Sequence, residues 1–277
     1  PSGRNIHGID PWRLPTDHAL ERGRQMADAL LFKHRAEHGS YPRTVAQALW
    51  AMDTIKSEGE GLGVVLALVG AEPQRDGQGK IHRFALQPLA TLGRPRIDVL
   101  LDVSSIFRDT FQMSLDLLDT LFREAATVDE SPDQNYVRAH AQEMLAAGRS
   151  LEEATARIFT QAPGLYGTGV DAVIEESQWE DTAQLADLYQ KRNGYTAGGA
   201  RNGAPAPEAL RSMLSKVDHV FQAIDSVEYG LTDMTHYYGH SGAMKLAADR
   251  ERGAPVSLTY AETFTGEVRI SASDDLL

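Results

Sequence analysis

The sequence contains no cysteine, which excludes disulfides and thiolate metal sites. Its longest apolar stretches, such as LGVVLALVGA at 62–71, are too short to span a bilayer, and no signal peptide opens the chain. Positive charge is scarce, because 27 Lys and Arg residues stand against 39 Asp and Glu residues, giving a formal net charge of −12. Such acidity argues against duplex nucleic acid as a partner. We therefore expect a cytoplasmic protein with no integral membrane segment and no nucleic-acid partner.

The composition is that of a folded globular protein. Of the 277 residues, 42% are hydrophobic and 24% are charged, and this length allows one large domain or two ordinary ones. The chain starts without methionine and stops in EVRISASDDLL, just after what reads as a strand. These ends favour a piece of a longer chain.

Alternating patterns predict an α/β fold, with a parallel sheet flanked by helices, in the first half. A helix is expected from Thr16 to Gly39, and parallel neighbouring strands are expected at Val45–Trp50 and Ile97–Val103. LGVVLALVG (62–70) and FQMSLDLLDTLFREAA (111–126) have helical spacing.

The second half is predicted to be mostly helical. We expect an α/β region at 1–130 with site loops at its strand ends, and a helical region at 131–277 that ends in a strand. A glycine-rich loop, GYTAGGARNGAPAP (194–207), interrupts the helices. The expected helices cover 133–147, 151–158, 170–176, 182–191 and 207–224.

GEGLG (59–63) is expected to follow a strand and to open a helix, where glycine loops often hold phosphate. The spacing is not G-x-G-x-x-G, no Walker lysine follows, and Glu60 would repel a phosphate. The carboxylate of Glu60 is either a ligand-binding group at a strand end or a solvated group that serves the helix dipole.

Two further motifs carry candidate side chains. In SSIFRDTF (104–111), Arg108 and Asp109 either bind a carboxylate or form an ion pair that holds the turn. In DMTHYYGH (233–240), Asp233, His236 and His240 have helical metal-ligand spacing, but Gly239 and the lack of a zincin glutamate argue against zinc.

The opening stretch GRNIHGIDPWRLPT (3–16) is either an ordered functional loop or a connector. It resembles, together with four later stretches, the large H subunit of magnesium chelatase. The four are YPRTVAQALWAMDTIKSEGEGLGVVLALVG, LGRPRIDVLLDVSSIFRDTF, RIFTQAPGLYGTGVDAVIEESQWED and SVEYGLTDMTHYY. They come in the family's order from Gly3 to about Arg269. Ala51 and Met52 depart from the family's usual Gly-Thr after Trp50.

The aerobic cobaltochelatase large subunit is a similar relative. Ile6, His7 and the LTDMTHYY pattern follow the magnesium type, and the loop at 194–207 looks like the bacteriochlorophyll branch.

The resemblance implies a subunit that binds protoporphyrin IX during ATP-dependent insertion of Mg²⁺. ATP would be used by an AAA+ ATPase subunit and its companion, not by this chain. Mg²⁺ needs oxygen ligands, the pyrrole protons need a base, and the porphyrin propionates need cations. On this basis we predict catalytic roles for Glu60, His7 and Asp53, with transient Mg²⁺ binding by Glu60 and Asp53. Substrate binding is predicted for Arg4, Trp50, Arg108, Asp109 and His236.

The isolated chain is predicted to be inactive. The alternatives are a cobaltochelatase subunit that inserts Co²⁺ into a corrin ring, and a non-catalytic scaffold. If the two predicted strands are parallel neighbours, Glu60 and Arg108 should emerge at one edge, and the opening loop should bring His7 to them.

Overall fold

The computed structural model describes residues 9–224, 238–262 and 267–272. Its centre is a seven-stranded sheet with the order β6-β5-β4-β1-β7-β8-β9. Its strands are β1 (Thr44–Leu49), β4 (Asp98–Val103), β5 (Ile158–Thr160), β6 (Tyr195–Thr196), β7 (His219–Ile224), β8 (Ser257–Glu262) and β9 (Arg269–Ala272).

The sheet is mostly parallel. β1 runs parallel to both β4 and β7, and β5 and β8 extend the parallel part on either side. The edge strands β6 and β9 are antiparallel to their neighbours. The predicted parallel pair is confirmed, because Thr44–Leu49 pairs with Asp98–Val103 in register.

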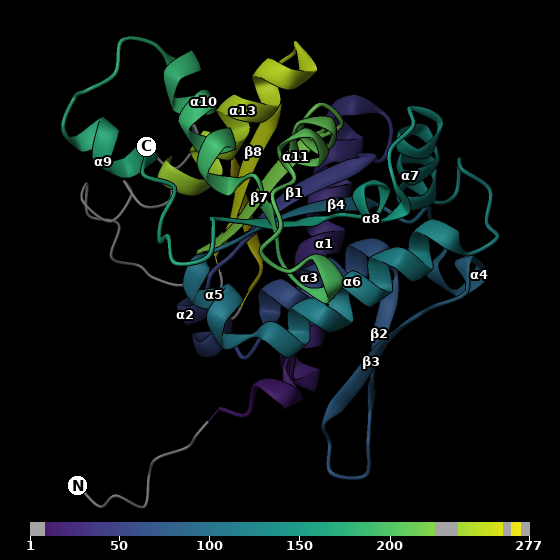
Figure 1. Cartoon of the computed structure of the whole chain (residues 1–277). Coiled ribbons are helices and arrows are strands. Elements are labelled where there is room, and N and C mark those ends of the chain that lie inside the picture. The colour runs from purple at the N-terminus through teal and green to yellow at the C-terminus, as the bar shows by residue number, and fades with distance from the viewer. Residues whose placement is uncertain (1–8, 225–237, 263–266, 273–277) are drawn as a thin grey trace, which may run out of the picture.

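Helices cover both faces of this sheet (Figure 1). They are α1 (Asp17–His38), α2 (Ala51–Lys56), α3 (Glu60–Val69), α4 (Leu89–Leu92), α5 (Ser105–Thr110), α6 (Gln112–Thr127), α7 (Tyr136–Ala146), α8 (Leu151–Ala154), α9 (Val170–Glu175), α10 (Thr182–Asn193), α11 (Pro207–Leu214) and α13 (Ala243–Arg252). The short turns are η2 (Pro11–Arg13), η3 (Gly199–Arg201) and η4 (Tyr238–Gly242).

The strand register assigns the helices to faces, because successive side chains of a strand point to opposite sides. On one face, Gln47 of β1 donates a hydrogen bond to the carbonyl of Gly61 in α3 at 2.9 Å. On the other face, the Asp98 carboxylate of β4 contacts His140 of α7 at 2.8 Å. Helices α10, α11 and α13 pack against one another on the same side as α7 (Figure 1).

Helix α1 has the ends that the sequence predicted. The Thr16 hydroxyl accepts a hydrogen bond from the backbone of Ala19 at 3.3 Å, and Gly39 ends the helix with a φ of 75°. Helix α1 packs closely on α3 through glycines. A Cβ built on Gly23 would lie 2.5 Å from the carbonyl carbon of Gly63, so only glycine allows the backbones this approach.

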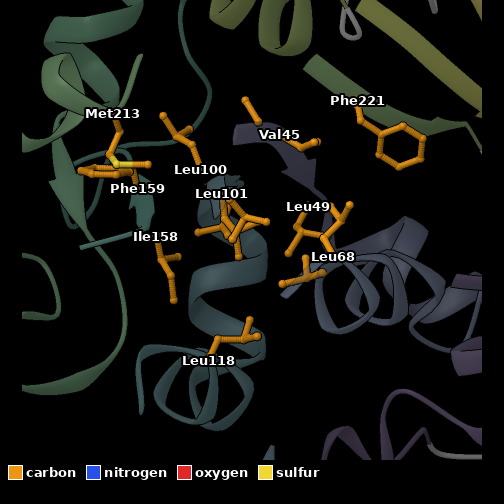
Figure 2. Close-up of a cluster of buried hydrophobic side chains, with 14 of the residues drawn as sticks. Val45, Leu49, Leu68, Leu100, Leu101, Leu118, Ile158, Phe159, Met213 and Phe221 are labelled. Atoms are coloured by element: carbon orange, nitrogen blue, oxygen red, sulfur yellow. The ribbon is translucent and has the colours of Figure 1, made fainter. Parts of the chain in front are cut away.

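The core runs through the whole sheet. Figure 2 shows part of it, with Leu49 of β1 beside Leu68 of α3 on one face of the sheet and Phe159 of β5 beside Met213 of α11 on the other. The central strands β1 and β4 are buried at every position. This burial on both faces explains why they read as continuous apolar runs rather than alternating ones.

A two-stranded hairpin, β2 (Ala71–Arg75) and β3 (Ile81–Leu86), stands apart from the large sheet. Figure 1 shows it projecting from the body of the molecule below α6. None of the helices in the described ranges combines the length and the apolar character needed to cross a membrane.

Three sequence predictions about elements were wrong. The helix expected over 207–224 ends at Leu214, and His219–Ile224 forms the buried strand β7. A short apolar run fits either structure by spacing alone, and here pairing with β1 and β8 decides. The helix expected over 151–158 ends at Ala154, and strand β5 begins at Ile158. GEGLG follows helix α2, not a strand.

The second half supplies helices and also β5 to β9, so one sheet draws strands from both halves of the chain. The division into two regions at residue 130 stays a prediction.

Candidate functional site

The connections that leave β1, β4 and β5 meet at the carboxyl edge of the sheet. Trp50 follows β1, Ser104 follows β4, and the segment 161–169 follows β5. The Ser104 amide donates to the carbonyl of Leu49 at 3.0 Å, which ties the first two strand ends together. The strand order reverses beside β1, since the chain passes to β4 and β5 on one side and from β7 to β8 on the other. Open α/β sheets bind ligands at such an edge.

A cavity of about 250 Å³ lies at this edge. Large apolar side chains surround its mouth, since Met52 is 57% exposed, Ile106 is 56% exposed and Tyr166 is 60% exposed. A cluster of exposed apolar side chains on a folded protein is typical of a ligand-binding or interaction surface. The complete lining is Trp50, Ala51, Met52, Ser104, Ser105, Ile106, Tyr166, Gly167 and His240.

Two larger hollows, of about 420 and 670 Å³, lie beside α7. The smaller of them is lined by charged side chains that pair with one another, such as Arg211 with Glu208 at 3.0 Å. The larger is open and shallow along Arg43, Tyr136 and Glu143. Neither hollow has a histidine in its lining, whereas the carboxyl-edge cavity has His240, so the latter is the better candidate.

A histidine backed by a buried carboxylate lies at this cavity. Nδ1 of His240, in η4, is 3.6 Å from Oδ2 of Asp102, the penultimate residue of β4. Asp102 is fully buried, and His240 is the basic side chain that it contacts within the described ranges. The indole of Trp50 meets the His240 ring edge-on, with 5.2 Å between ring centroids.

Tyr189 of α10 is fully buried and lies beside Asp102. Burial and the neighbouring Asp102 charge raise the pKa of this phenol well above its usual value. Tyr189 therefore stays neutral and adds no second negative charge beside Asp102. The arrangement can orient an imidazole, and a neutral imidazole is able to accept a proton from a bound molecule.

The structure places the predicted site residues in different surroundings. Trp50 lines the cavity, and Asp53, half-buried in α2, lies with it in a small adjoining cavity. Glu60 lines neither of these two cavities. Its side chain is buried between α1 and α3, with Oε1 3.3 Å from Nε of Arg22. Burial raises the pKa of Glu60, and the Arg22 guanidinium acts against this rise.

Arg108 and Asp109 lie on α5, next to the cavity, and form an ion pair at 2.9 Å. The Arg108 side chain is buried and donates from Nη1 to the carbonyls of Gln161 and Ala162. Asp109 is half-exposed and accepts a hydrogen bond from the Tyr166 hydroxyl at 3.0 Å. This geometry favours the ion pair that holds the turn, one of the two interpretations of the motif.

Arg4, His7 and His236 lie outside the described residues, as does Asp233. The expected cluster of His7 with Glu60 and Arg108 therefore stays a prediction. Within the described ranges, no group of three or more His, Cys, Asp or Glu side chains is arranged to hold a metal ion.

Sequence reasoning assigned no role to several lining residues. Ser105 and Ile106 stand in SSIFRDTF and Tyr166 in a stretch that resembles the family, but none was named as a site residue, and Asp102 reads as an interruption in an apolar strand. An aspartate inside a buried strand is the one available signal, because a charge there needs a partner.

Comparisons with known proteins agree with this architecture. The family model described as CobN/Magnesium Chelatase matches residues 1–276. The chain is 47% identical over 100% of its length to the H subunit of magnesium chelatase from Chlorobaculum parvum, of which it covers 22%. It is 37% identical over 93% of its length to the aerobic cobaltochelatase subunit CobN of Pseudomonas aeruginosa, of which it covers 21%.

A solved structure has the same fold. The catalytic subunit of cobaltochelatase from Mycobacterium tuberculosis superposes with a TM-score of 0.94 at 32% identity, covering 99% of this chain and 24% of that one. The chain thus spans about a fifth of the length of the relatives that it matches. The sequence resemblance is confirmed, and the chain belongs to the CobN/magnesium chelatase family of metal chelatase large subunits.

Proposed function

We propose that this chain forms one wall of the porphyrin site in the large subunit of a magnesium chelatase, which inserts Mg²⁺ into protoporphyrin IX for bacteriochlorophyll or chlorophyll synthesis. One observation carries the proposal: the cavity at the carboxyl edge joins an apolar rim to an imidazole backed by a buried carboxylate. The choice of magnesium rests on the 47% identity to a magnesium chelatase large subunit along the whole chain.

The size of the cavity argues for one wall rather than a complete site. Its volume of about 250 Å³ is below the roughly 300–1,000 Å³ of pockets that enclose a drug-sized ligand. Met52, Ile106 and Tyr166 instead offer an open apolar surface. A flat tetrapyrrole can lie against this surface with one face or edge, while the rest of the parent protein supplies the opposite wall.

Metal insertion releases two pyrrole protons. In this proposal His240 accepts one of them, and a second base, predicted to be His7, accepts the other. The Asp102 carboxylate beside Nδ1 favours the tautomer that carries its proton on that nitrogen, which leaves Nε2 as the acceptor. Once Nε2 is protonated, the nearby carboxylate stabilises the imidazolium ion. Trp50 packs against the ring of His240 and limits its rotation.

Mg²⁺ is a substrate here, and oxygen ligands deliver it best. Asp53 is the predicted ligand nearest the cavity, since it shares an adjoining hollow with Trp50. Transient Mg²⁺ binding by Asp53 and Glu60, and propionate binding by Arg4 and Arg108, stay predictions. So does a cytoplasmic location.

ATP would be hydrolysed by the AAA+ subunit and its companion, which act on the large subunit. The isolated chain should be inactive, because it spans only about a fifth of its relatives and lacks these partners.

The second candidate is a cobaltochelatase subunit that acts on Co²⁺ and a corrin ring. The 37% identity to the Pseudomonas aeruginosa protein and the TM-score of 0.94 favour it over unrelated functions. A third candidate, a scaffold that only contacts the ATPase partners, does not account for the imidazole backed by a buried carboxylate at the cavity.

Reconstitution tests the reaction. A full-length large subunit that carries this sequence is combined with the ATPase subunit and its companion, then given ATP with either Mg²⁺ and protoporphyrin IX or Co²⁺ and a corrin. We expect Mg-porphyrin fluorescence to appear and no cobalt corrin to form. Cobalt corrin without Mg-porphyrin would contradict the choice of metal, and Mg-porphyrin made by the 277-residue chain alone would contradict its predicted inactivity.

A further inference from the structure

The segment 161–169, which carries Tyr166 to the mouth of the cavity, has little rigidity of its own. It contains Gly164, Gly167 and Gly169, whose φ angles are 81°, 73° and 73°. Glycine has more conformational freedom to lose on folding than any other residue. A segment with three glycines in left-handed conformations must therefore be held in place by contacts from outside.

Helix α5 supplies these contacts. The Arg108 guanidinium donates to the carbonyl of Gln161 at 2.9 Å and to that of Ala162 at 3.3 Å. The Ser105 hydroxyl donates to the carbonyl of Leu165 at 2.7 Å. Arg108 is only 6% exposed, so its bonds to the segment are formed away from water and are correspondingly strong.

We call the hydrogen bonds from Arg108 and Ser105 to the segment 161–169, together with those of Asp109, the α5 clamp. Asp109 extends it to the side chain of Tyr166. One carboxylate oxygen accepts from Nε of Arg108 at 2.9 Å, and the other accepts from the Tyr166 hydroxyl at 3.0 Å. The hydrogen bond from Arg108, helped by that from Tyr166, holds the pKa of Asp109 below its usual value. The carboxylate thus stays ionised and able to accept both bonds at neutral pH.

The α5 clamp leaves the Tyr166 side chain exposed. The tyrosine is 60% exposed, and its neighbours Leu165 and Ile106 are 43% and 56% exposed. A buried arginine and a charged carboxylate are therefore used to hold an aromatic ring in solvent, at the rim of the cavity. A purely structural tyrosine would bury its ring instead.

We propose that Arg108 and Asp109 are positioning residues that fix Tyr166 at the cavity mouth as the aromatic group that contacts the tetrapyrrole. This inference rests on the proposed function, and it adds a substrate-contacting residue and the two that orient it. For Arg108 this role replaces the propionate contact predicted from the sequence, because its guanidinium already donates to Gln161, Ala162 and Asp109. The Tyr166 hydroxyl orients the side chain through its hydrogen bond to Asp109, and the aromatic ring contacts the tetrapyrrole.

A double-mutant cycle tests the inference. Porphyrin affinity is measured with this chain by Soret-band titration with protoporphyrin IX, for the wild type, Tyr166→Phe, Asp109→Asn and the double variant. Tyr166→Phe keeps the ring and removes the one hydrogen bond to Asp109. We expect each single variant to weaken porphyrin binding about two- to tenfold, the range of one hydrogen bond. The double variant should bind porphyrin as tightly as the single variant with the lower affinity, because both substitutions remove the same hydrogen bond.

In the reconstituted full-length enzyme, the same variants should raise KM for porphyrin and leave kcat within about twofold, because neither group takes part in proton or metal transfer. A structural defect would lower the amount of folded enzyme and so reduce apparent kcat instead. Additive losses, or wild-type affinity in both single variants, would overturn the inference. In those cases the proposed function survives if Ile106→Asp still weakens porphyrin binding, whereas no binding by the wild type would overturn both.

Discussion

Asp102 and His240 come from distant parts of the chain and meet at 3.6 Å, between Oδ2 and Nδ1, at the carboxyl edge of the sheet. The carboxylate is buried under the imidazole, and the imidazole lines the cavity. If this pair handles a pyrrole proton, Asp102→Asn should slow Mg²⁺ insertion by about tenfold or more, because an amide no longer favours the productive tautomer.

The readout is kcat in the reconstituted enzyme, with porphyrin affinity as the control. We expect affinity to stay close to that of the wild type. In a His240→Gln background, Asp102→Asn should have no further effect. An Asp102→Asn enzyme with wild-type kcat would show that the pair has no part in proton transfer.

Glu60→Gln separates two roles of Glu60. The ion pair with Arg22 at 3.3 Å, buried between α1 and α3, predicts that the variant loses about 1–3 kcal/mol of unfolding free energy. A metal-delivering Glu60 instead predicts slower Mg²⁺ insertion at unchanged stability. Denaturant unfolding of this chain, together with the reconstituted assay, distinguishes the two. The geometry favours the first outcome, and a fully stable, inactive variant would reinstate the second.

His219 should make stability depend on pH. Burial, with the neighbouring His34, lowers its pKa from 6.5 to about 3. Below pH 6.5 the unfolded chain binds a proton that the folded chain does not, so stability falls as pH falls. This one group should remove about 1.5 kcal/mol between pH 6.5 and 5, at 1.36 kcal/mol per pK unit.

Unfolding free energies at several pH values check this dependence. His219→Gln should flatten the slope in that window, whereas replacement of the exposed His82 by Gln should leave it unchanged. Equal slopes in the wild type and His219→Gln would contradict a buried, neutral His219.

The close contact of α1 with α3 gives a stability prediction that is independent of the site. In Gly23→Ala the new Cβ would lie 2.5 Å from the backbone of Gly63, so the helices must move apart. We expect a loss of about 1–3 kcal/mol in unfolding free energy. Gly77→Ala, in the hairpin turn with no atom within 4 Å of its Cβ, should change stability by less than about 0.5 kcal/mol. Similar effects of the two variants would refute the tight crossing.

The sequence was sufficient for the parts of the fold that depend on local signals. The caps of α1 at Thr16 and Gly39 and the doubly buried strands β1 and β4 follow from residue type and spacing. Strand β7 was missed because HVFQAI fits either a helix or a buried strand until its neighbours are known.

The site was harder to predict, because its members are joined by pairing across the sheet. Arg108 and Asp109 were predicted from a motif at a strand end and Trp50 from the family resemblance, and they do lie at or beside the cavity. The partner of Asp102 could not be found from spacing, since His240 reads locally as one of a helical pair with His236. The role of Tyr166 could not be predicted either, because it depends on a hydrogen bond to Asp109 in a distant segment of the chain.

The central claim is that the carboxyl-edge cavity binds one face of a tetrapyrrole, and a porphyrin titration of this chain tests it most directly. The Soret band of protoporphyrin IX is followed for the wild type, for Ile106→Asp at the rim, and for Phe32→Asp. Phe32 is 77% exposed on α1 and does not line the cavity. We predict saturable binding by the wild type and by Phe32→Asp, and at least tenfold weaker binding, about 1.4 kcal/mol, by Ile106→Asp. No Soret change with the wild type, or equal affinity of all three proteins, would contradict the account.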